Sequence, residues 1–194
     1  MNSSNVISLG EALIDRLGPI GGDHSFEGPF TNCFGGAPAN VACALARLGV
    51  KVSFIGSLGN DEFGLKFRNL MNDRGINISG LQIDESRPTR VVLVRRDANA
   101  ERSFGGFEGD QGLGFADQAI SIEHMLNNWK LISKDAKWLI VGTIPLASEI
   151  SSKAFLNCIE KAMEDGIKIV LDLNWRPTFW RKNLSKDPKP TIDE

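Results

Sequence analysis

The sequence predicts one α/β domain with a mainly parallel central β-sheet. Strand and helix patterns alternate along the chain, as they do in βαβ units. With 194 residues, 42% of them hydrophobic and 24% charged, the chain can bury a substantial core. The predicted elements are strands at residues 6–15, 51–56, 78–84, 137–142 and 168–173 and helices at 39–48, 62–74, 121–133 and 149–165.

The helices have recognisable starts and stops. Asp61 is expected to cap helix 62–74, and Gly75 to end it. Ser121 opens helix 121–133, and Gly166 ends helix 149–165. Strand 137–142 is the clearest buried strand, and the polar, proline-containing residues 182–194 fit a linker or the start of a helix.

Charge and cysteine content argue against several classes of protein. The formal net charge is -2 and no basic stripe is visible, so neither nucleic acid nor an anionic membrane is an expected partner. No apolar run approaches the length of a bilayer span, and residues 1–5 carry no basic residue, which favours a cytoplasmic location. The three cysteines Cys33, Cys43 and Cys158 have unrelated spacings and are expected to be reduced thiols.

Two glycines precede the first predicted helix. Gly35 and Gly36 allow the backbone to turn sharply and lie flat against a ligand, and Pro38 suits the first turn of a helix. The pattern predicts a bare helix N-terminus, whose N–H groups and dipole favour oxygen-rich ligands. Asn40 adds a side chain that both donates and accepts hydrogen bonds. Taken alone, the glycine pair equally fits an ordinary loop before a packed helix.

Acidic and basic candidates follow predicted strands. Strand 6–15 ends at Asp15, and ligand groups in open α/β sheets lie at such strand ends, although an isolated Asp also fits a solvated turn. Strand 168–173 is followed by Asn174 and Arg176, which alternate with apolar residues and should point the same way. The alternative is that Arg176 forms an ion pair with Asp172 that closes a turn.

A β-hairpin is predicted at residues 89–107, with its turn at 97–100. Arg102 and Phe104 lie two residues apart and should project from one face, where a guanidinium and a ring can hold a sugar. A solvated Arg beside a packed Phe fits the spacing equally well. The preceding glycine-rich segment 18–33 reads as a surface loop.

Other site patterns are weak or absent. Gly112 and Gly114 form a Gly-x-Gly that no strand feeds, and no Walker sequence occurs. His24 and His124 are isolated, so the sequence offers no zinc site, and no metal-binding residue is expected in this chain.

The glycine pair at residues 35–36 and the helix after it are followed by a Gly-x-x-Gly-x-Asp-x-x-Gly run at residues 56–64. Together with Asn40 and the Asp-x-Asn-x-Arg-Pro run at 172–177, this sequence resembles the ribokinase-like (PfkB) sugar kinases, and among them the fructokinases. The resemblance implies a ribokinase-like fold with a small β-sheet lid formed by segments of about 16–34 and 86–108. It also implies ATP-dependent phosphorylation of a sugar hydroxyl with Mg²⁺, fructose as the expected sugar, and a homodimer formed through the lid.

The resemblance assigns roles to individual residues. The expected substrate-binding residues are Asp15, Gly35, Gly36, Asn40, Arg102, Phe104 and Arg176. Asn174 and Arg176 are expected near the nucleotide or the transferred phosphate.

The resemblance covers only the first part of the family's length. The Gly-Ala-Gly-Asp motif, which supplies an anion hole and a catalytic base in the family, does not occur in this sequence, so no catalytic residue is expected here. The chain alone is therefore expected to be inactive. A non-catalytic sugar-binding or regulatory protein and a nucleoside kinase of the same fold are the alternatives.

Overall fold

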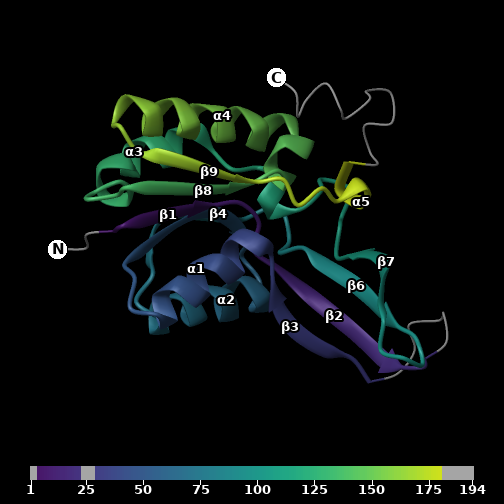
Figure 1. Ribbon diagram of the computed structural model, residues 1–194. Helices are drawn as coiled ribbons and strands as arrows, with labels where there is room; N and C mark the ends of the chain where they lie inside the picture. Colours follow the sequence, from purple (N-terminus) through teal and green to yellow (C-terminus); the bar gives the residue numbers. More distant parts are fainter. Residues whose placement is uncertain (1–3, 23–28, 181–194) are drawn as a thin grey trace.

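The computed structural model describes residues 4–22 and 29–180 and contains two β-sheets (Figure 1). The larger sheet has five parallel strands in the order β5-β4-β1-β8-β9. Its strands are β1 (Val6–Leu9), β4 (Val52–Gly59), β5 (Asn77–Asp84), β8 (Trp138–Gly142) and β9 (Lys168–Asp172). This confirms the prediction of an α/β fold with a mainly parallel central sheet.

Helices cover both faces of the larger sheet (Figure 1). The helices α1 (Ala37–Arg47) and α2 (Glu62–Asp73) lie on one face, and α3 (Ile122–Ile132) and α4 (Glu149–Glu164) lie on the other. Alternate side chains of the strands pack into two hydrophobic clusters, one on each face. Fully buried Phe54 belongs to the cluster under α1 and α2, where burial of such a side chain contributes roughly 1.5–3 kcal/mol.

The smaller sheet has four strands in the order β3-β2-β6-β7. Its strands are β2 (Leu13–Ile20), β3 (Thr31–Gly35), β6 (Val91–Arg96) and β7 (Arg102–Glu108). β2 pairs with β3 antiparallel and with β6 parallel, and β6 and β7 form the predicted hairpin. Figure 1 shows this sheet extending away from the larger one. Its strands fall largely within the segments expected to form a lid, although β2 begins at Leu13.

Among the described residues, three short elements lie between or after the main ones. They are the 3-10 turn η1 (Ala116–Gln118), which follows β7, the 3-10 turn η2 (Ile144–Ala147), which follows β8, and the helix α5 (Pro177–Trp180), which follows β9. His24 and the segment 182–194, for which the sequence suggested a solvated loop and a linker or helix start, lie outside the described residues.

Element boundaries differ from the predictions where the chain turns. The predicted strand 6–15 is two strands, because β1 ends at Leu9 and the chain turns at Gly10. A Cβ on Gly10 would lie 2.4 Å from Cγ of Pro38, so the chain approaches α1 too closely there for another residue. Asp15 therefore lies within β2 of the smaller sheet, and its prediction as the end of the first strand was wrong.

The predicted strands β8 and β9 are both present, but β9 is more exposed to solvent than β8. In β8, Leu139 and Val141 are fully buried whereas Trp138 is 41% exposed. β9 is an edge strand that ends at Asp172 rather than at residue 173, and Val170 and Leu171 are more than two-fifths exposed. The apolar pattern predicted the strand correctly but could not show that it lies at an edge.

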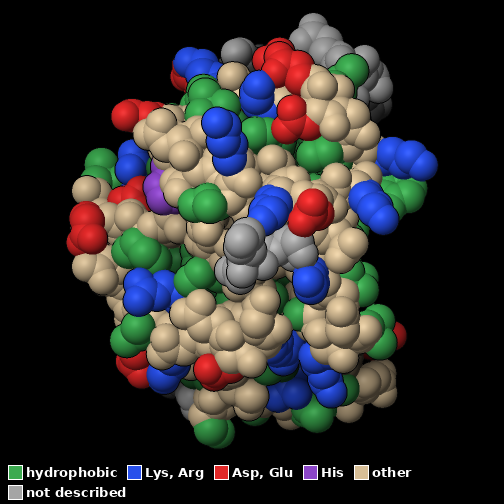
Figure 2. All heavy atoms as spheres, turned by 90° about the vertical axis from the view of Figure 1, so that its left-hand side faces the viewer, with side chains coloured by type: hydrophobic (Ala, Val, Ile, Leu, Met, Phe, Trp, Pro, Cys, Tyr) green, Lys and Arg blue, Asp and Glu red, His purple; other side chains and the backbone are tan. Residues whose placement is uncertain are grey.

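The remaining surface shows no single dominant charge on the face seen in Figure 2. Lys and Arg side chains are interspersed there with Asp and Glu side chains. Among the described helices, none is long and apolar enough to cross a membrane. Cys33 in β3 is partly exposed, Cys43 and Cys158 are buried, and all three carry free thiols.

The glycine run at residues 56–64 has a structural explanation. Asp61 caps α2 by accepting the Gly64 N–H at 2.8 Å, and its other oxygen accepts the Thr89 N–H at 2.7 Å. A Cβ on Gly59 would lie 2.5 Å from the Thr89 nitrogen, and one on Gly64 would lie 2.1 Å from the Gly59 carbonyl oxygen. The run therefore packs α2 against the connection into β6.

We expect Gly64→Ala to lower the free energy of unfolding by about 1–3 kcal/mol, because the added methyl group overlaps the Gly59 carbonyl. Urea denaturation monitored by circular dichroism measures this. Gly18→Ala is the matched control, since a Cβ on Gly18 would meet its nearest atom at 3.6 Å, an ordinary contact. If Gly64→Ala were as stable as the wild type, helix propensity would outweigh the overlap.

Candidate functional site

A cavity of about 370 Å³ lies where the two sheets meet. It is bordered by the residues that follow β1, β8 and β9 of the larger sheet, by the first turn of α1, and by one face of the smaller sheet. The carboxyl ends of parallel strands are the usual place for ligand sites in open α/β sheets. The residues lining the cavity are Glu11, Leu13, Asp15, Gly36, Ala37, Asn40, Val92, Val94, Arg102, Ser103, Phe104, Ile144, Asn174, Arg176 and Phe179.

Six of the seven expected substrate-binding residues line this one cavity, and Asn174 joins them. The seventh, Gly35, does not line it. A Cβ on Gly35 would lie 2.5 Å from Oδ2 of Asp15 and 2.8 Å from Leu13, so Gly35 leaves the room that the Asp15 carboxylate occupies. The structure thus places Gly35 in support of Asp15 and not at the cavity surface.

Asp15 and Arg102 face the cavity from the smaller sheet. Burial raises the pKa of Asp15 above its ordinary value, and the positive charge of Arg102 opposes that rise. Phe104, two residues along β7, packs edge-on against Phe107 with ring centroids 5.0 Å apart. A carboxylate, a guanidinium and an aromatic face therefore border the cavity together.

The first turn of α1 differs from the predicted bare terminus. Gly36 occupies the N-cap position of α1 with φ 95°, and as a glycine it has no side chain that could cap the helix. The Ala37 N–H, however, donates to Oε1 of Glu11 at 2.9 Å. The prediction of a wholly unpaired terminus was therefore wrong, because a distant carboxyl group caps it. Asn40, the fourth residue of α1, is exposed and lines the cavity.

Glu11 is the site residue that sequence reasoning missed. Its side chain is only 2% exposed, and its Oε2 atom is buried without a hydrogen-bond partner among the described residues. Burial raises the pKa of Glu11 from 4.5 to about 7, an effect that nearby Asp117 increases and Arg90 reduces. The available signal was an acidic residue two positions after the buried strand β1.

Asn174 and Arg176 lie in the segment that follows β9. The Asn174 N–H donates to Oδ1 of Asp172 at 3.1 Å, and Thr143 donates to the Leu173 carbonyl at 2.9 Å. These bonds shape the turn that brings both side chains to the cavity. Within the described residues no ion pair joins Asp172 to Arg176, so the alternative of a turn-closing salt bridge does not apply.

A buried ion pair fixes the end of the smaller sheet. Two of the guanidinium nitrogens of Arg90, Nε and Nη2, each donate to one oxygen of the Asp117 carboxylate at 2.8 Å, and both side chains are almost fully buried. The rings of Phe107, Phe115 and Phe179 lie 4.5–4.9 Å from the guanidinium. A second cavity of about 320 Å³ adjoins this cluster.

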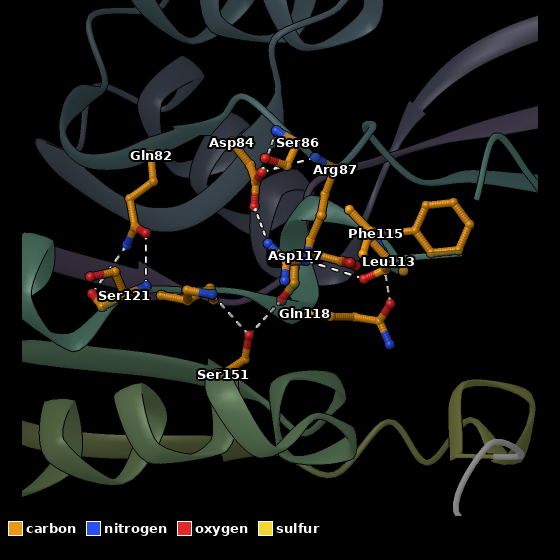
Figure 3. Close-up of polar contacts among 12 residues, drawn as sticks. Gln82, Asp84, Ser86, Arg87, Leu113, Phe115, Asp117, Gln118, Ser121 and Ser151 are labelled. Atoms are coloured by element: carbon orange, nitrogen blue, oxygen red, sulfur yellow. Dashed lines mark hydrogen bonds and ion pairs between the residues drawn. The ribbon is translucent and has the colours of Figure 1, made fainter. Parts of the chain in front are cut away.

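The backbone around Asp117 is anchored from α4 (Figure 3). Ser151 donates to the Asp117 carbonyl at 2.8 Å and accepts the Ile120 N–H at 3.0 Å. Farther along the same connection, Gln82 of β5 accepts the Ser121 N–H at 2.8 Å. These long-range bonds hold the segment after β7 against the larger sheet.

The described residues do not form a metal site. Across residues 4–22 and 29–180, no group of three or more His, Cys, Asp and Glu side chains is placed to hold a metal ion. Mg²⁺ in phosphoryl-transfer sites is held by one or two carboxylates together with substrate phosphates, and no such residue is assigned among those described.

The fold and the cavity together define an α/β protein with a polar ligand site at the junction of a parallel sheet and a smaller sheet. Residues 3–192 match the pfkB family of carbohydrate kinases. The chain belongs to this family and has its ribokinase-like fold.

Relatives and solved structures agree with the family. A fructokinase from Solanum tuberosum is 34% identical over 181 residues, which are 93% of this chain and 54% of the relative. A fructokinase from Xylella fastidiosa with bound ATP superposes with a TM-score of 0.82 at 29% identity, covering 98% of this chain and 57% of that one. A fructokinase from Vibrio cholerae O395 with fructose, ADP and calcium bound gives a TM-score of 0.77 at 29% identity, covering 100% and 57%. The chain spans about half the length of these proteins.

We expect Glu11→Gln to become more stable relative to the wild type as pH rises from 5 to 8. Unfolded Glu11 ionises near pH 4.5 and folded Glu11 near 7, so the wild type loses stability across that interval, by roughly 3 kcal/mol, and glutamine does not titrate. Urea denaturation at several pH values measures the difference.

Glu160→Gln, at an exposed position of α4, is the control for losing a glutamate anywhere on the protein. A pH-independent difference for Glu11→Gln would mean that the folded protein ionises Glu11 as readily as the unfolded chain does.

Proposed function

We propose that this chain supplies the sugar-binding part of an ATP-dependent carbohydrate kinase that phosphorylates a sugar hydroxyl. The observation that carries the proposal is the convergence of Asp15, Asn40 and Arg176, from three separate segments, on one cavity. Family membership gives the class of reaction, and the fructokinase relatives make fructose the expected sugar. A cytoplasmic location and a homodimer through the smaller sheet remain part of this proposal.

Each group suits a polyol. The Asp15 carboxylate accepts hydrogen bonds from hydroxyl groups, and the Asn40 amide both donates and accepts them. Phe104 offers an apolar surface to the carbon face of a sugar, while Arg102 can donate to its oxygens. Val92 and Val94 add apolar side chains to the lining of the cavity.

Arg176 and Asn174 are proposed to face the phosphate. A guanidinium donates two parallel hydrogen bonds to phosphate oxygens and stabilises their charge. In this proposal ATP supplies the transferred phosphoryl group, with Mg²⁺ as the expected accompanying ion. The two side chains then bind the oxygens of the transferred phosphoryl group next to the sugar hydroxyl.

We expect Asp15→Asn to weaken fructose binding about 10- to 100-fold, because the hydroxyl groups lose an ionised acceptor. Isothermal titration calorimetry with fructose, ketodeoxygluconate, ribose and adenosine measures this and ranks the ligands. Asp73→Asn, at an exposed position of α2, is the control. Preference for adenosine would favour a nucleoside kinase, and unchanged fructose affinity in Asp15→Asn would contradict the assignment of Asp15.

We expect the 194-residue chain alone to show no robust turnover in a coupled ADP-release assay with fructose and MgATP. The anion hole and base of the family motif are absent from its sequence, and phosphoryl transfer depends on such positioning and charge stabilisation. Fructose binding without turnover would agree with the proposal. Rapid ADP release that depends on fructose would contradict it.

A further inference from the structure

One buried carboxyl oxygen at the cavity has no hydrogen-bond partner among the described residues. Glu11 lies in the connection between β1 and β2, lines the cavity and is 2% exposed. Its Oε2 atom is buried and, within the part of the chain that the structure describes, makes no hydrogen bond. A buried polar atom without a hydrogen bond destabilises the folded protein, so a structure that retains one calls for an explanation.

Capping of α1 accounts for only one of the two carboxyl oxygens of Glu11. Oε1 accepts the Ala37 N–H at 2.9 Å and satisfies the helix terminus. That role requires one oxygen acceptor, and the second oxygen is not used by it. Gly142, at the end of β8, lies beside Oε2 but gives it no hydrogen bond, and a Cβ built on Gly142 would be 3.7 Å from this oxygen, an ordinary van der Waals contact.

The charges around Glu11 do not pair with it either. Arg90 and Asp117 act on it electrostatically in opposite directions, and they hold each other in a bidentate ion pair. The Arg90 guanidinium is also surrounded by aromatic rings. The free oxygen of Glu11 therefore has the cavity as its remaining source of a partner.

Resting on the proposed function, we propose that Glu11 is a further sugar-binding residue, whose Oε2 forms a hydrogen bond with one hydroxyl group of the bound sugar. A hydroxyl group both donates and accepts, so it can pair with this carboxyl group whether or not the carboxyl group is protonated. Since Oε1 holds Ala37, the contact would tie the sugar to the first turn of α1, which also carries Asn40.

The experiment compares Glu11→Met and Glu11→Gln with the wild-type chain. Calorimetric titrations use fructose and its monodeoxy analogues, each lacking one hydroxyl group. We expect Glu11→Met to bind fructose about tenfold more weakly, and one deoxy analogue to bind wild type and Glu11→Met equally well. Glutamine keeps an acceptor for Ala37 and a polar group at the Oε2 position, so Glu11→Gln should bind fructose within about threefold of wild type.

A purely structural role gives a different pattern. If Glu11 acts only as a helix cap, Glu11→Met lowers the affinity for fructose and every deoxy analogue by the same factor, which would overturn the inference. Unchanged fructose affinity in Glu11→Met would overturn it too. Circular dichroism shows whether each variant folds. If Glu11→Met does not fold, Glu11→Ala replaces it as the variant without an oxygen at this position, and an equal loss of affinity for all analogues again counts against the contact.

The outcomes also separate this inference from the proposed function. If wild type binds fructose and Asp15→Asn weakens the binding while the Glu11 variants do not, only the role of Glu11 fails. If wild type binds none of the four ligands tested for the proposed function, both fail.

Discussion

The close contact between residues 10–12 and the first turn of α1 determines where the two sheets meet. Gly36 approaches the Glu11 carbonyl so closely that a Cβ there would lie 2.4 Å from its oxygen. Ser8 donates to the Pro38 carbonyl at 2.8 Å, and Glu11 accepts the Ala37 N–H. These contacts fix the exit of β1, the entry to β2 and the start of α1 relative to one another. The cavity is the space that this junction leaves beside the carboxyl ends of the strands.

A second anchor lies at the base of the β6–β7 hairpin of the smaller sheet. The Arg90–Asp117 ion pair joins the entry of β6 to the segment that follows β7, and Ser151 ties that segment to α4. A buried ion pair of this kind is costly to break from one side, since the remaining charge stays buried. The hairpin that carries Arg102 and Phe104 is thus held at both of its ends, while its strands extend away from the larger sheet (Figure 1).

The sequence predicted best those features that depend on local pattern. Asn40, Asn174 and Arg176 follow from a helix start and a strand end, and both features place side chains at one edge of a parallel sheet. Asp15 was selected for the wrong structural reason. Its pattern predicted one strand at residues 6–15, whereas the close contact between Gly10 and Pro38 divides this segment into two strands. Glu11 was not predicted as a site residue, because its burial and its hydrogen bond to the Ala37 N–H depend on a contact between residues 26 positions apart in the sequence. The Arg90–Asp117 pair likewise depends on tertiary packing that no spacing rule reveals.

The distribution of the three thiols has a practical consequence for spectroscopy. Burial raises the pKa of Cys158 to about 12, which keeps its sulfur protonated and unreactive, and Cys43 is also enclosed. Cys33 is the partly exposed thiol, and its backbone pairs with Asp15 across β2 and β3. A maleimide fluorophore would therefore attach at Cys33 in the native chain, next to the strand that carries the cavity carboxylate, without any cysteine first having to be replaced.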